Sequence, residues 1–171
     1  MASLRRITTV YVETQDRIRL AGEIQGADDG KSGPAVALWL TQRLLNRLIP
    51  HLCQWLEQRE PALPRGEVLQ TFAQQVATAA LEPQPAVEVS AQQAEILVHG
   101  VDVKRSRNSV TLVFRGPDGS AVAELSTASV SLRQWLHILS AQYRKAQWPL
   151  TTWPVWLREA HVRAGEAAMI H

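Results

Sequence analysis

The stretch LWLTQRLLNRLIPHLCQWLE, residues 38–57, is the densest apolar segment of the chain, and the fold prediction starts from it. Its apolar side chains recur at steps of three and four residues and would share one face of a helix: Leu38, Leu45, Leu48, Leu52 and Trp55, with Leu40, Leu44 and Ile49 beside them. A face this broad indicates a helix that other elements cover. Pro50 removes a backbone donor, so we expect either a kink between helices at 35–49 and 51–59 or a new helix that starts at Pro50.

Two alternating stretches before this segment predict a β-hairpin. Ile7–Glu13 and Arg17–Ile24 each alternate apolar with polar residues, and Thr14–Asp16 can turn between them. After the central helix, Glu67–Leu81 predicts a second helix that ends before Pro83. The side chains expected on its buried face are Val68, Leu69, Phe72, Val76 and Ala79, with Gln70, Gln74 and Gln75 outside.

Strand patterns dominate the second half of the chain. Val87–Val89 is a short candidate strand, Ala94–Val103 a longer one, and Val110–Arg115 is expected to pair with Ala121–Ser126 across a Gly-Pro-Asp-Gly turn. A third helix follows, in which Ser131 and Gln134 predict a capping box and Val130 and Trp135 a hydrophobic staple. Its apolar stripe would hold Leu132, Trp135, Leu136, Leu139 and Tyr143.

These elements predict an α+β fold with the order ββ-αα-βββ-α and a tryptophan-rich C-terminal tail. We expect an antiparallel sheet of about five strands with three main helices packed on it. Residues 1–148 would form one domain. Residues 149–171 would be a tail that docks either on this domain or on a partner.

Composition narrows the class of protein. The chain has 171 residues, a formal net charge of +2 and a pI near 9.0, which do not by themselves demand a nucleic-acid or membrane partner. A single cysteine, Cys53, excludes an intramolecular disulfide. The apolar run is too charged for a bilayer span, and residues 1–12 show no secretory pattern, so we expect a cytoplasmic protein.

Motifs for catalysis or metal binding are incomplete. Gln25–Ser32 approaches a phosphate-binding loop, but only three residues separate Gly26 from Gly30, where the motif needs four. His51 and Cys53 are two residues apart on a helix, so they point in different directions and indicate no metal site. We therefore expect no cofactor and no small-molecule ligand. An enzyme whose site is assembled from scattered residues remains the third alternative for function.

The six tryptophans are the compositional excess of the chain. Tryptophan is enriched at the centres of protein interfaces, so the first prediction is a non-catalytic adaptor, assembly factor or subunit, in contact with another protein or a second copy of itself. The candidate interface residues are Trp148, Trp153 and Trp156 in the tail, with Trp39 and Trp55 in the central segment. The alternative is that the tail covers the chain's own core.

A basic hairpin tip supports a second prediction of function, binding to nucleic acid. Lys104, Arg105 and Arg107 cluster between two predicted strands and could contact phosphates of a nucleic acid. Six more arginines could join this basic surface if the fold brings them together: Arg5, Arg6, Arg17, Arg19, Arg43 and Arg47. A solvated turn would carry the same charges without any such function.

Overall fold

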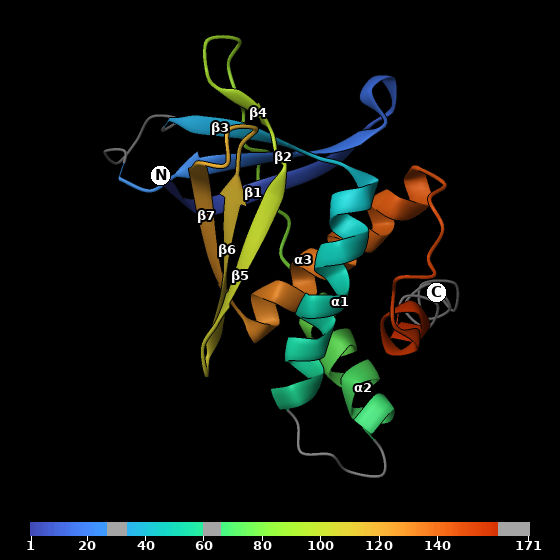
Figure 1. The fold of residues 1–171 in the computed structure, drawn as a ribbon. Helices are drawn as coiled ribbons and strands as arrows, with labels where there is room; N and C mark the ends of the chain where they lie inside the picture. Colours follow the sequence, from blue (N-terminus) through green and yellow to red (C-terminus); the bar gives the residue numbers. More distant parts are fainter. Residues whose placement is uncertain (27–33, 60–65, 161–171) are drawn as a thin grey trace.

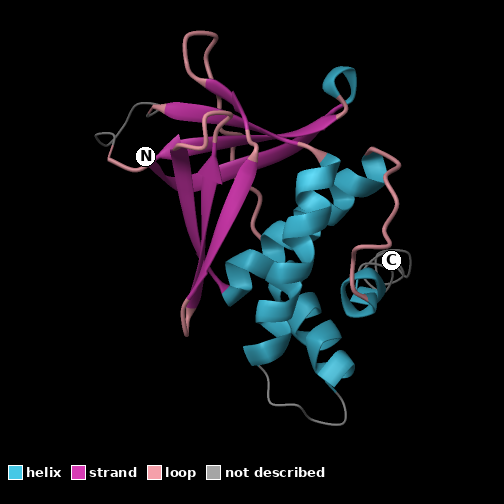
Figure 2. Ribbon diagram, viewed as in Figure 1, coloured by secondary structure: helices cyan, strands magenta, loops and turns pink. Residues whose placement is uncertain are grey.

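The computed structural model describes residues 1–26, 34–59 and 66–160, and these form an α+β fold, as predicted. The elements follow in the order β1 (Ala2–Val12), a 3-10 turn (Glu13–Gln15), β2 (Arg17–Ile24), β3 (Ala35–Leu40), α1 (Gln42–Arg59), α2 (Gly66–Ala79), β4 (Glu95–Leu97), β5 (Gly100–Arg105), β6 (Ser109–Arg115), β7 (Ala121–Ala128) and α3 (Ser129–Lys145), with a short helix at 155–160. The helices gather beside the sheet (Figure 2).

The sheet has seven strands in the order β4-β3-β2-β1-β7-β6-β5 and is mixed, which corrects the prediction of about five antiparallel strands. The predicted hairpins β1–β2 and β6–β7 are antiparallel, but β1 pairs with β7 and β3 with β4 in parallel. The β1–β7 pairing covers only Ala2–Leu4, after which the two strands separate. In Figure 1, β1–β3 therefore run across the direction of β5–β7, and the sheet curls around the helices.

Residues 35–40 form strand β3 instead of the start of the central helix, so the prediction for this part of the segment is wrong. β3 lies between β2 and β4, and five of its six side chains are buried. A strand covered on both faces shows a continuous apolar run that periodicity cannot separate from a buried helix. The helix begins after Thr41, whose Oγ1 accepts a hydrogen bond from the Leu44 amide (3.2 Å).

α1 continues through Pro50 as one helix, and neither predicted division at this residue occurs. Pro50 lies on the exposed side of α1. The opposite side packs into the core through Leu45, Leu48, Ile49, Leu52 and Leu56. The core also takes Ile18 and Leu20 from β2, Leu112 and Phe114 from β6, and the predicted apolar stripe of α3.

The capping box predicted for α3 is absent. The helix begins at Ser129, and its N-cap Ala128 makes no side-chain hydrogen bond. Gln134 reaches α2 instead, where its Nε2 donates to the Ala77 carbonyl (3.0 Å). Val130 is 53% exposed, so it forms no staple with the buried Trp135.

The segment between α2 and β4 crosses the sheet without forming a strand at 87–89. Arg6 donates to the Pro85 carbonyl, and the Val87 amide donates to Thr8 Oγ1 (2.8 Å). Val87 then packs with Ala21 on the face of the sheet that points away from the helices, which we call the outer face. The predicted strand 94–103 is interrupted at 98–99 and gives β4 and β5.

Candidate functional site

Helix α2 is turned the opposite way from the orientation that its sequence predicts. Val68, Phe72 and Val76 are 64%, 64% and 53% exposed, and Leu69 is 36% exposed. We call these four side chains the α2 outer face. Gln70, Thr71 and Gln74, at 3%, 5% and 1% exposure, are buried instead. The amphipathic pattern located the helix correctly but gave the wrong buried face.

A buried arginine of α3 explains this orientation. Arg133 is 5% exposed, and its Nη2 donates to Gln70 Oε1. Gln74 Nε2 donates to the Arg133 carbonyl (2.9 Å), and Gln70 Nε2 donates to the Leu56 carbonyl of α1 (3.4 Å). The guanidinium also lies over the Trp156 ring, 5.3 Å from its centroid. Because buried polar groups need such partners, the glutamine face of α2 is held inward.

The α2 outer face has almost no charge. Between Gly66 and Ala79 the only charged residue is Glu67, at the N-terminal end of the helix. Scattered apolar side chains on a protein surface are normal, but four on one face of one helix form a contiguous patch. Such patches mark contact sites for another macromolecule.

The five tryptophans assigned to an interface do not gather on one exposed surface. Trp148, Trp153 and Trp156 are 8%, 2% and 3% exposed and belong to this chain's own core. Trp156 Nε1 donates to Glu57 (2.9 Å), and Trp148 Nε1 donates to Asp16 (3.2 Å). A contact with another molecule through these three would require residues 148–160 to leave the core first.

The remaining two predicted interface tryptophans lie on β3 and α1. Trp39 is partly exposed on the outer face of the sheet, where its Nε1 donates to Glu95 (3.4 Å). Trp55 is 5% exposed on α1, and its Nε1 donates to the Ser106 carbonyl in the β5–β6 turn (3.3 Å).

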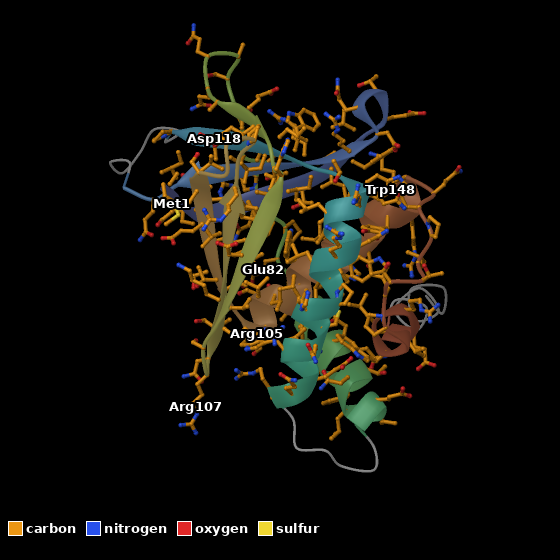
Figure 3. The ribbon with its side chains drawn as sticks, in the orientation of Figure 1. Met1, Glu82, Arg105, Arg107, Asp118 and Trp148 are labelled. Carbon is orange, nitrogen blue, oxygen red and sulfur yellow. The ribbon has the colours of Figure 1, made fainter. Side chains whose placement is uncertain are left out.

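The basic hairpin tip divides between two faces. Val101 and Val103 pack against the core, so Arg105 lies on the α1 side of β5, and Lys104 lies on the outer face with Asp102. The Arg115 guanidinium, with Lys104 farther away, lowers the pKa of Asp102. Figure 3 shows Arg105 between the β5–β6 hairpin and α1, and Arg107 at the free end of the hairpin. The predicted cluster is thus divided, with Arg105 on the α1 side, Lys104 on the outer face and Arg107 at the tip.

A cavity of about 720 Å³ opens where β1 and β7 separate. The hydroxyl groups of Thr8 and Thr9 line this cavity. The Thr9 hydroxyl accepts a hydrogen bond from Trp135 Nε1 (3.0 Å), and the Thr8 hydroxyl accepts one from the Val87 amide. Arg5 and Arg6 at its rim bind Glu23 and lower the pKa of that carboxyl. These two hydroxyls and two guanidinium groups are therefore held by partners within the chain.

The described part of the chain holds no group of three or more metal-ligating side chains. Within the same residues no helix is long and apolar enough to cross a membrane. His51 is exposed and Cys53 is buried, in different directions, as their spacing predicts. The phosphate-loop near-match at 25–32 lies almost wholly outside the described residues.

Cys53 is expected to resist thiol reagents in the folded protein. Burial raises the pKa of the Cys53 thiol to about 12, so the reactive thiolate is scarce near pH 8. A chromogenic disulfide reagent should therefore modify Cys53 only as fast as the protein opens, and quickly in denaturant. Rapid modification of the native chain, without denaturant, would contradict this burial.

Comparisons with models of known protein families, with curated proteins and with solved structures each find no match to this chain.

Proposed function

We propose that this protein is a non-catalytic interaction subunit that forms a homodimer through the α2 outer face. The observation that carries the proposal is the orientation of α2, which buries two glutamines and exposes Val68, Leu69, Phe72 and Val76. Exposing these side chains to water costs free energy that a contact surface would recover. The interface is thus proposed at α2 instead of at the tryptophans.

A second copy is the occupant that suits this face. A twofold interface places the same surface on both sides, so the surface must be self-complementary. A helix face without charge fulfils this condition, because no like charges would meet at its centre. If the two α2 helices pack antiparallel, the two Glu67 side chains lie at opposite ends of the contact.

The mass of the intact chain in solution tests the proposal. Light scattering at moderate salt and several concentrations should give a dimer of about 38 kDa, twice the 19.0 kDa of the chain. Phe72→Asp should shift the dimer dissociation constant upward by at least a hundredfold, because it places a charge at the centre of an apolar contact.

The matched control is Val130→Asp, which makes the same kind of change at an exposed residue of α3. It should leave the dimer intact, and circular dichroism should show that both variants are folded. A monomeric wild-type chain at every concentration would reject the second copy as the partner. Equal dissociation by Phe72→Asp and Val130→Asp would reject the α2 outer face as the interface.

A further inference from the structure

The solvent face of α1 carries a row of basic side chains. Arg43, Arg47 and His51 follow one another at steps of four residues, so they share one face, and all three are exposed. Gln54 and Gln58 continue this exposed face without adding an acid. The only carboxylate of α1 is that of Glu57, which accepts a hydrogen bond from Trp156 of the tail.

The β5–β6 turn extends this row at the far end of α1. Arg105 Nη2 donates to the His51 carbonyl (3.4 Å), and Trp55 Nε1 donates to the Ser106 carbonyl. Arg59, which lies over the Trp55 ring, donates to the Arg107 carbonyl. We call Arg43, Arg47, Arg59, Arg105 and Arg107 the arginine stripe. At a rise of about 1.5 Å per residue it is about 24 Å long from Arg43 to Arg59.

The charges of the arginine stripe are not neutralised within the described residues. The four ion pairs there use Arg5, Arg6, Arg19 and Arg115, and none uses a member of the stripe. Arg43 lies in the first turn of α1, which holds no acid, and a cation at that end opposes the helix dipole. Like charges four residues apart, as at Arg43 and Arg47, also destabilise a helix. Arginines that destabilise their own helix in this way indicate a role other than stabilising the fold.

We infer that the arginine stripe binds the phosphate backbone of double-stranded nucleic acid. Arginine forms forked hydrogen bonds to phosphate, and about 24 Å corresponds to roughly seven phosphates of one strand at about 3.4 Å spacing. No tryptophan, tyrosine or phenylalanine side chain is exposed on α1 or in the β5–β6 turn, because Trp55 of α1 is buried, so unpaired bases have no such stacking platform. The contact is therefore with the backbone of a duplex and independent of base sequence.

Fluorescence anisotropy of labelled 20-base-pair duplexes tests this inference, with one DNA and one RNA arm. The intact chain should bind at 50 mM KCl and its affinity should fall steeply by 200 mM, with a slope of log K against log salt of about −4.5 for five contacts. The double variant Arg43→Gln/Arg47→Gln should have a slope smaller in magnitude by about two. Its affinity at 50 mM KCl should be at least tenfold lower. Neither side chain takes part in a described hydrogen bond, so the fold should be kept.

The matched control is Arg19→Gln/Lys104→Gln, which removes two cations from the outer face of the sheet. This variant should bind like the intact chain. Equal losses of affinity in both double variants would show that only the net charge of the protein matters, and would overturn the inference. Absence of duplex binding at 50 mM KCl would also overturn it, as would equal competition by poly-glutamate at matched charge. Binding of either duplex with the expected loss supports it, and the two arms then identify the nucleic acid. The outcome does not depend on whether α2 forms a dimer.

Discussion

Trp153→Ala is expected to lower the free energy of unfolding by about 3–5 kcal/mol, the usual loss for truncating a buried tryptophan. Trp153 is 2% exposed, and its ring lies edge-on to that of Tyr143, with the centroids 5.2 Å apart. Tyr143 in turn contacts Trp148 (5.1 Å), and Trp148 contacts Tyr11 of β1 (5.5 Å). The alanine variant would leave a cavity at the end of this row, so the residues after α3 would lose their anchor on the core.

Urea unfolding followed by far-ultraviolet circular dichroism measures this loss. Trp153→Phe should lose much less, because it keeps an aromatic ring against Tyr143. Val155→Ala, at a neighbouring residue that is 44% exposed, should stay within about 0.5 kcal/mol of the wild type. If Trp153→Ala unfolded at the wild-type midpoint, residues 148–160 would not be part of the stable core and would be free to bind a partner.

Local patterns in the sequence predicted local structure well. The β1–β2 and β6–β7 hairpins were predictable because each combines alternation with a turn that suits it, and Asp16 adopts the left-handed conformation that ends the first turn. The apolar stripe of α3 was predictable for the same reason, because its five members have one periodicity and one buried side. In such segments the pattern and the final environment agree.

Contacts between distant segments leave no signal in the sequence. β1 pairs with β7 over three residues, although more than a hundred positions separate them, and nothing in either strand encodes this parallel contact. The continuous apolar run of β3 indicates a helix as readily as a strand, because five of its six side chains are buried. The arginine stripe was only partly predictable, since the spacing of Arg43 and Arg47 places them on one face but not beside the β5–β6 turn.

The orientation of α2 was the largest failure of the sequence pattern, and its cause lies on another helix. Apolar periodicity predicts burial only when the facing surface is apolar. Here the facing surface includes Arg133, a buried cation that needs oxygen acceptors. Gln70 Oε1 accepts from its guanidinium and Gln74 Nε2 donates to its carbonyl, and the apolar side chains of α2 therefore point outward. No property of residues 66–79 alone shows this.

Gln70→Leu is expected to lower the free energy of unfolding by about 2–3 kcal/mol, even though it places an apolar side chain in a buried position. The change removes the acceptor of Arg133 Nη2 and the donor to the Leu56 carbonyl. Hydrogen bonds to a buried charge contribute more than those between neutral groups, and leucine can replace neither. Unfolding in urea again gives the measurement, with Gln75→Leu on a more exposed side of α2 as the matched control.

Arg133→Met in the Gln70→Leu background should recover part of this loss, because the cation that needed Gln70 is then gone. A double-mutant cycle of the four proteins would give a coupling energy of about 1–2 kcal/mol if the two side chains act together. A neutral or stabilising effect of Gln70→Leu alone would mean that this pair does not hold the glutamine face inward. A clear coupling would instead connect a buried charge on α3 to the exposure of Val68, Phe72 and Val76, so that the polar contact inside the protein determines the apolar surface proposed for the dimer.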